Sequence, residues 1–246
     1  MPAPLRRYLG CLGFLTRLAP ARVAPDEEIA DWVAWLPAVG LTLGAVLVLP
    51  FRCGLLAGHP WVQAWLAVVL NVWLTRGLHY DGLADVADGM GQHTSPERFW
   101  TIIKDSRCGP FGVLALVLAV AGQLALWSAL FAAGRWGGAA WAIILGRQAT
   151  PLLGFFTRDL TRPGLGRLFL NGADGGALVL TLCQTAAFGL LLTSPSAVLF
   201  GLVLLALVMI PLHRLARFVG GVNGDFLGAA ILLGELVGGL AALSMG

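Results

Sequence analysis

Charged side chains are scarce in this chain. Only 12% of its 246 residues are Asp, Glu, Lys or Arg, and 58% are hydrophobic, whereas a soluble globular domain carries about 25% charged residues. So few polar groups cannot cover a soluble globule of this size. The shortage excludes an ordinary soluble protein and predicts one integral membrane domain over residues 1–246, with no second, soluble domain.

Net charge and cysteine are also low. A net charge of +3 at pH 7 is too small to argue for a nucleic-acid partner, so none is expected. The four cysteines are scattered and form no CxxC pair. We therefore expect them to be unpaired.

Hydrophobic runs long enough to cross a bilayer recur seven times. They lie near residues 33–50, 61–78, 111–133, 138–156, 176–193, 197–213 and 226–244. This pattern predicts an all-α, polytopic helix bundle with about seven transmembrane helices. Residues 1–31 precede the first run, and their amphipathic stretch 4–18 is expected to lie in the membrane interface or dip into it. Closure of this stretch over the active site is the alternative.

The basic residues predict an orientation. With the N-terminus inside, 13 of the 16 Lys and Arg residues fall on inner segments, while Arg52 and Arg135 fall outside and Arg147 lies within a run. Cytoplasmic loops of membrane proteins carry such an excess of positive charge. Twelve of the 13 acidic residues lie on the same side. We therefore expect a cytoplasmic N-terminus and an active site that faces the cytoplasm.

Three aspartates, Asp81, Asp85 and Asp88, directly follow the second run. Spacings of four and three place them within about 60° of one another on one helix face. A divalent cation is the simplest partner for such crowded carboxylates, and oxygen ligands suit Mg²⁺ or Mn²⁺. We predict a Mg²⁺ site formed by all three in a cytoplasmic active-site loop, 79–110. His79 could bind phosphate or shuttle a proton. The alternative is a solvated helix whose acids only face water.

The segment before the third run offers groups for phosphate. Arg107 presents a fork of donors, and Asp105 could join the metal shell or orient Arg107. Ser106 lies between them as a candidate substrate contact. Gly109 and Gly112 allow close backbone approach at a helix start, which favours an anion. A basic anchor beside the membrane is the alternative.

Later charged residues complete the candidate substrate-binding set. Asp225 stands before the last run, where it could cap a helix or join the site. Arg162 and Arg167 lie in a glycine-containing loop and could reach a nucleotide or a second phosphate. Arg147 and Glu235 fall within runs, where an ionisable group must be paired, neutral or functional. A structural pair and a direct use of either residue both stay open.

The chain resembles the cobalamin synthases, the adenosylcobinamide-GDP ribazoletransferases, over nearly its full length. The residues that carry the resemblance are Phe14-Leu15-Thr16-Arg17-Leu18, His79-Tyr80-Asp81-Gly82-Leu83-Ala84-Asp85 with Asp88-Gly89, Asp105-Ser106-Arg107 with Gly109 and Gly112, Gly164-Leu165-Gly166 with Phe169, Gly224-Asp225 with Gly228-Ala229, and Gly234-Glu235-Leu236. The family usually has threonine or a similar small polar residue where this chain has Asn223.

The resemblance implies a late step of cobalamin (vitamin B12) assembly at the bacterial inner (plasma) membrane. Adenosylcobinamide-GDP and α-ribazole, or its 5′-phosphate, would give adenosylcobalamin, or its 5′-phosphate, and GMP, with Mg²⁺ required. Asp81, Asp85, Asp88 and Arg107 are the expected catalytic residues, and Asp88 would bind metal or take the hydroxyl proton. Membrane lipid is an expected partner. A homo-oligomer, or association with other cobalamin-assembly enzymes, stays open.

The residues themselves favour phosphoryl-group transfer between two bound substrates, which depends on positioning and charge neutralisation. A CDP-alcohol phosphotransferase is the nearest rival, but it expects Asp-Gly-x-x-Ala-Arg, and this chain has Asp85 and Val86 where that alanine and arginine belong. An intramembrane prenyltransferase expects a second aspartate-rich cluster, which is missing. A transporter would explain Arg147 and Glu235, but no inverted repeat is visible.

Overall fold

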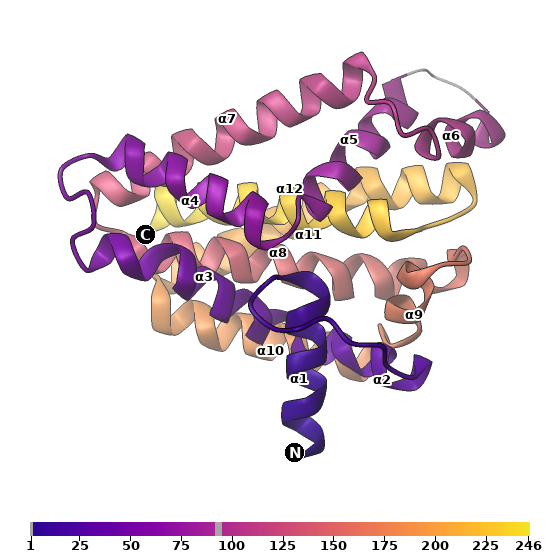
Figure 1. The fold of residues 1–246 in the computed structure, drawn as a ribbon, viewed down its shortest axis with the longest axis horizontal. Coiled ribbons are helices and arrows are strands. Elements are labelled where there is room, and N and C mark those ends of the chain that lie inside the picture. The colour runs from indigo at the N-terminus through magenta and orange to yellow at the C-terminus, as the bar shows by residue number, and fades with distance from the viewer. Residues whose placement is uncertain (1, 92–94) are drawn as a thin grey trace.

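Long apolar helices lie side by side and build the molecule (Figure 1). The structure, a computed structural model, describes residues 2–91 and 95–246. The long helices are α3 (Leu36–Arg52), α4 (Pro60–Leu74), α7 (Pro110–Ala132), α8 (Trp136–Thr157), α10 (Gly175–Leu192), α11 (Pro195–Val219) and α12 (Gly224–Met245). They occupy the seven predicted places. The all-α, polytopic class is therefore confirmed.

Within residues 2–91 and 95–246, five segments are long and apolar enough to cross a membrane. They are Asp26–Arg52, Pro110–Ala132, Gly175–Leu192, Pro195–Val219 and Gly224–Met245. Helix α4 is apolar but has only 15 residues, and a helix of that length is about 22 Å long against a hydrocarbon core of about 30 Å. Helix α8 contains Arg147 and Gln148, which make it less apolar. The predicted crossings at α4 and α8 stay predictions.

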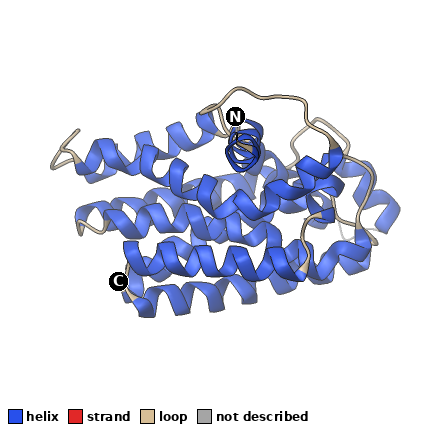
Figure 2. Cartoon of the chain, turned by 90° about the horizontal axis from the view of Figure 1, so that it is seen from below, coloured by secondary structure: helices blue, strands red, loops and turns tan. Residues whose placement is uncertain are grey.

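Shorter helices connect and cover the long ones. They are α1 (Ala3–Leu15), α2 (Asp26–Asp31), η1 (Trp32–Trp35), α5 (Leu78–Gly91), α6 (Pro96–Ile103), η2 (Arg158–Leu160) and α9 (Leu165–Asn171). Figures 1 and 2 show that the described residues are helices joined by loops. In Figure 1, α6 and α9 lie toward the same end of the bundle. The predicted loop 79–110 is thus mostly helical in its described part. All four cysteines are free, as predicted.

Helix α1 crosses the long helices steeply (Figure 1), which is the direction of a helix that lies in the membrane interface. Its first residues are exposed, but Cys11, Leu12 and Leu15 are buried. Phe14 packs against Phe169 of α9, with ring centroids 5.2 Å apart. The direction of α1 agrees with a place in the interface, and its buried C-terminal part agrees with closure over the site, so both stay predictions. Contact of α1 with lipid stays a prediction.

Helices α8 and α12 approach closely because small residues face each other. A Cβ atom on Gly234 would come within 2.8 Å of the Gly146 Cα, and one on Gly238 within 2.8 Å of the Ala142 Cα. A Cβ atom on Gly146 would lie 2.6 Å from the Glu235 Cγ. Such small residues allow membrane helices to pack at short distance. This helix pair forms the centre of the bundle.

A buried ion pair joins the same two helices. Arg147 Nη1 of α8 contacts Glu235 Oε1 of α12, and both side chains are 0% exposed. The other carboxylate oxygen accepts hydrogen bonds from Asn71 Nδ2 at 3.1 Å and Gln123 Nε2 at 2.8 Å. The Tyr80 hydroxyl donates to Gln123 Oε1 at 2.6 Å. The network connects α4, α5, α7, α8 and α12, which favours the structural use of Arg147 and Glu235.

This network predicts a large effect of breaking one partner. Removing one charge of a buried pair typically costs about 3–5 kcal/mol, because the other charge is left without compensation. We expect Arg147→Met and Glu235→Gln each to lower the unfolding temperature in detergent by several degrees or to prevent folding. The double variant should be more stable than the sum of the two single effects predicts.

An exposed ion pair provides the matched control. Arg217 Nη1 lies 2.9 Å from Asp159 Oδ2, and the two side chains are 52% and 55% exposed. Such exposed pairs contribute about 0–1 kcal/mol to the free energy of unfolding. Arg217→Gln should leave the unfolding temperature nearly unchanged. Equal unfolding temperatures for Arg147→Met and Arg217→Gln would disprove the structural role of the buried pair.

Candidate functional site

A sharp turn between α4 and α5 brings the aspartate helix against the bundle. Arg76 and Gly77 have φ angles of 57° and 70°, a left-handed conformation that is uncommon for a residue other than glycine. The Arg76 guanidinium donates to the backbone carbonyls of Gly13, Phe14 and Thr16 at 3.1–3.2 Å. These bonds tie the turn to the end of α1.

Helix α5 packs tightly on the start of α12. A Cβ atom on Gly82 would lie 2.7 Å from the Asp225 carbonyl oxygen, and one on Gly228 would lie 3.2 Å from the Leu78 carbonyl oxygen. The close approach brings Asp225 beside the aspartate helix. Asn223 rather than Asp225 caps α12: its Oδ1 accepts from the Phe226 N–H at 3.4 Å, and its Nδ2 donates to Asp225 Oδ2 at 2.6 Å. Of the two roles left open for Asp225, the helix cap is therefore filled by Asn223 instead.

The three predicted aspartates share α5 but differ in environment. Asp81 is exposed, Asp85 is partly buried and Asp88 is buried. Burial, and then the charges of Asp225, Asp81 and Asp88, raise the pKa of Asp85 to about 7. Asp225 is thus a fourth carboxylate of this cluster, and its charge contributes to the raised pKa of Asp85.

This cluster is not a preformed coordination shell. Within residues 2–91 and 95–246, no three His, Cys, Asp or Glu side chains are arranged to hold a metal ion. The chemistry of the donors nevertheless suits Mg²⁺, because carboxylate oxygens are its preferred protein ligands. A divalent cation would also relieve the repulsion that raises the pKa of Asp85. The residues fit the ion, with side-chain adjustment on binding.

Asp88 caps helix α7. Its Oδ2 accepts the Gly109 N–H at 2.7 Å and its Oδ1 accepts the Gly112 N–H at 2.8 Å. A Cβ atom at Gly112 would collide with Asp88 Oδ2, so glycine is required there. The two glycines were predicted to receive a substrate anion, but in this structure the anion at the α7 N-terminus is Asp88. Its use as metal ligand or base would compete with this cap.

Arg107 lies beside Asp105 near the same helix start. Arg107 Nε donates to Asp105 Oδ1 at 3.0 Å, and Nη2 donates to Oδ2 at 2.6 Å. The hydrogen bonds and charge of Arg107 lower the pKa of Asp105 to about 2. Arg107 and Asp105 border a cavity of about 260 Å³ together with Asp88. The geometry thus favours Asp105 as the residue that orients Arg107.

Two larger cavities flank Leu78. The aspartate cavity, of about 630 Å³, is lined by Asp81, Asp85, Ser106 and Arg76 among others. Arg76 was not among the predicted site residues. A sequence signal for it existed, since an arginine immediately before the helix break at Gly77 lies about one turn from Asp81.

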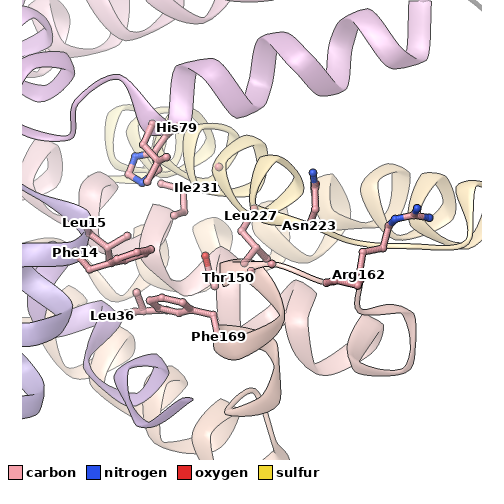
Figure 3. Close-up of a pocket in the computed structure, with 16 residues that line it drawn as sticks. Phe14, Leu15, Leu36, His79, Thr150, Arg162, Phe169, Asn223, Leu227 and Ile231 are labelled. Carbon is pink, nitrogen blue, oxygen red and sulfur yellow. The ribbon is translucent and has the colours of Figure 1, made fainter. Parts of the chain in front are cut away.

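The inner cavity, of about 350 Å³, lies on the other side of Leu78 and has a mostly apolar lining (Figure 3). His79 lines it and is 2% exposed. Burial, and then the charge of Arg147, hold the pKa of His79 well below its usual range. A neutral, buried imidazole is a poor phosphate ligand, so the structure does not favour the phosphate role predicted for His79.

Of the remaining predicted residues, Arg162 lines one of these two cavities and the others line neither. Arg162 lines the inner cavity, and its guanidinium lies 4.1 Å from the Trp100 ring centroid. Arg167 is exposed on α9 and lines neither the aspartate cavity nor the inner cavity. Arg147 and Glu235 are buried in the bundle and line neither cavity.

The cap predicts separate effects for two aspartates of the triplet. Asp88→Asn leaves one acceptor oxygen for two N–H groups, and losing a cap costs about 0.5–2 kcal/mol. We expect a lower free energy of unfolding in denaturant titrations without divalent cations. Asp81→Asn is the matched control, because Asp81 is exposed on the same helix. This substitution should leave the free energy of unfolding unchanged. Equal stability of the two variants would contradict the cap.

Asp85 predicts a pH dependence of stability. Its pKa is about 7 in the fold, against an ordinary value of 3.8, so the folded protein keeps a proton that the unfolded chain has released. The contribution of Asp85 to stability is therefore largest at low pH, falls between about pH 4 and pH 7, and is constant above. We expect the unfolding temperature in EDTA to fall less over this interval in Asp85→Asn. Parallel profiles for the two proteins would refute the shift.

Comparison with known proteins identifies the family. Residues 7–243 match the family described as cobalamin-5-phosphate synthase. Proteins named adenosylcobinamide-GDP ribazoletransferase are similar over almost the whole chain: one from Nitratidesulfovibrio vulgaris (strain Miyazaki F) is 50% identical over 96% of this chain and 94% of its own length. One from Thiobacillus denitrificans is 37% identical over 92% and 90%, and one from Escherichia coli is 36% identical over 96% and 98%. No solved structure matches. The chain therefore belongs to the cobalamin-5-phosphate synthase family and is a transferase of cobalamin synthesis.

Proposed function

We propose that this enzyme joins adenosylcobinamide-GDP to α-ribazole, or to its 5′-phosphate, in a Mg²⁺-dependent reaction. The products are adenosylcobalamin, or its 5′-phosphate, and GMP. A ribose hydroxyl of α-ribazole forms the new bond to the phosphate on the corrinoid arm, the bond from that phosphate to GMP breaks, and the hydroxyl loses its proton. The carboxylate cluster on α5, beside a cavity that the Arg76 side chain also lines, is the observation that carries this proposal.

Asp81 and Asp85 are the residues we propose to hold Mg²⁺. Both line the aspartate cavity, and their crowding with Asp225 disfavours full ionisation of Asp85 in the absence of a cation. Mg²⁺, when bound, supplies neutralisation of the diphosphate charge and so favours departure of GMP. Asp225, held by Asn223, supports the cluster from α12.

Two arginines are placed to receive phosphate oxygens. Arg76 lines the aspartate cavity beside Asp81 and Asp85. Arg107 is 86% exposed and its guanidinium is held by Asp105. Such a fork can bind phosphate oxygens in two places at once. Both cations would thus flank a diphosphate that approaches the carboxylate cluster.

Asp88 is proposed as a positioning residue rather than the base. Both of its oxygens accept backbone N–H groups of α7, so protonating it would weaken the cap. A loose transition state needs little help from a base, because the hydroxyl can lose its proton late. Asp88 then fixes the start of α7 and the adjoining segment that carries Arg107.

The site is proposed to face the cytoplasm of the bacterial inner membrane. Helix α5, which carries the three aspartates, lies toward the same end of the bundle as α6 (Figure 1). The basic residues of the chain favour this end as the inner one. The GDP-linked substrate and the nucleoside, or its 5′-phosphate, would then both be reached without crossing the bilayer.

An assay with both substrates tests the function. Protein purified in detergent is incubated with adenosylcobinamide-GDP, α-ribazole and Mg²⁺, and the corrinoid product and GMP are followed by chromatography. We expect equimolar cobalamin and GMP, no reaction in EDTA, and a loss of kcat/KM on the order of 100-fold in Asp81→Asn.

Asp26→Asn is the matched control, since Asp26 is an exposed acid on α2, and it should react like the wild type. A folded, lipid-reconstituted wild type that makes neither product would refute the proposed reaction. Full activity in EDTA, or in Asp81→Asn, would refute the metal site alone.

A further inference from the structure

We propose that the inner cavity binds the apolar aromatic base of the nucleoside acceptor. The inference rests on the proposed function, because it assigns one part of one substrate to a cavity of this chain. In this arrangement the base lies inside the helix bundle, and the ribose points toward the aspartates.

The lining of the inner cavity suits a flat, apolar ring. Phe14, Leu36, Phe169, Leu227 and Ile231 surround it (Figure 3), and they come from α1, α3, α9 and α12. The volume of about 350 Å³ falls within the range of small-molecule sites, about 300–1,000 Å³. Aliphatic and aromatic walls of this kind gain most from burying an apolar ring.

Two buried polar atoms in this cavity have no protein partner. His79 Nε2 and Thr150 Oγ1 make no hydrogen bond within the described part of the chain, and the two residues are 2% and 3% exposed. Buried polar groups are nearly always hydrogen-bonded, because leaving one unpaired is costly. Both residues line the cavity, so an acceptor on a ligand there is a partner that either of them could use.

The number of polar groups selects between the bases of the two substrates. A benzimidazole joined to ribose keeps one unsubstituted ring nitrogen, which accepts a hydrogen bond and which an imidazole N–H or a hydroxyl can satisfy. Guanine carries several donors and acceptors, and most would be unpaired in this cavity, because its other polar side chains are already engaged. Arg162 lies over the Trp100 ring, and Asn223 bonds to Asp225 and Phe226. Unpaired polar groups discriminate strongly against a ligand. The cavity chemistry thus favours the base of α-ribazole over that of the GDP moiety.

The two cavities adjoin, which gives the ribose a path to the reacting phosphate. Phe14 and Leu78 line both the inner cavity and the aspartate cavity. A nucleoside whose base lies against Phe14 can therefore extend toward Asp81. Holding the acceptor at a fixed point beside the metal site is the positioning that group transfer requires.

Steady-state kinetics of cavity variants test this inference. Ile231→Phe and Leu227→Phe fill the cavity, and Thr150→Val removes one donor without changing shape. We expect KM for α-ribazole to rise at least about 10-fold in the filled variants and about 5-fold in Thr150→Val, the effect of one hydrogen bond. KM for adenosylcobinamide-GDP should stay within about twofold of the wild type.

Thr157→Val is the matched control. Thr157 is buried on the same helix α8, but its hydroxyl donates to the Leu153 carbonyl at 2.8 Å, and it does not line the cavity. Its KM for α-ribazole should be unchanged. Unfolding temperatures of all variants identify any that fail to fold, and Thr150→Val keeps the test decisive if both phenylalanine variants do.

Equilibrium dialysis gives a readout that does not depend on turnover. Wild-type protein without Mg²⁺ or the second substrate should bind α-ribazole, Ile231→Phe should bind it at least about 10-fold more weakly, and guanosine should not compete. Unchanged KM and binding of α-ribazole in folded variants would overturn the inference. So would a rise in KM for adenosylcobinamide-GDP instead. An inactive wild type that still binds α-ribazole in this cavity would refute the proposed reaction but not the binding site.

Discussion

The buried pair of Arg147 and Glu235 is the constraint on which the rest of this structure depends. A charge in the interior of a membrane bundle is costly unless it is paired and hydrogen-bonded, and Asn71 and Gln123 complete the pairing at one carboxylate oxygen. The pair fixes α8 against α12. Because α12 in turn receives α5 at Gly228, the position of the aspartates depends on an ion pair that takes no part in the proposed chemistry.

Helix α5 divides its residues between structure and chemistry. Tyr80 donates into the buried network, and Asp88 caps α7. Asp81 and Asp85 face the aspartate cavity. Packing therefore holds these carboxylates near Asp225 despite their mutual repulsion. That repulsion, together with burial, raises the pKa of Asp85. A cation that binds there gains from a cluster already assembled by the fold.

Sequence and structure agree where a local pattern has one physical solution. The backbone N–H and C=O groups of an apolar run in a bilayer find no water, and a helix pairs all of them within the run. All seven helix positions were therefore predictable. The spacing of Asp81, Asp85 and Asp88 also predicted a shared helix face correctly. The cap at α7 was not predictable, because it joins Asp88 to Gly112 across two helices. The role of Asn223 at α12 was local, but the neighbouring Asp225 is an equally good capping type.

The inner cavity itself could not be predicted from the sequence, although His79 and Arg162 were among the predicted residues, because its walls come from segments far apart in the chain. Phe14, Thr150 and Ile231 meet only after α8 and α12 have packed. Charge marks where phosphate and metal would bind, whereas recognition of an apolar base needs a dry cavity, which leaves no polar signal. A membrane bundle already provides such an interior. In the proposed arrangement the base binds in the apolar interior and the phosphate binds at the polar end. One short chain can thus bind two chemically unlike parts of its substrates.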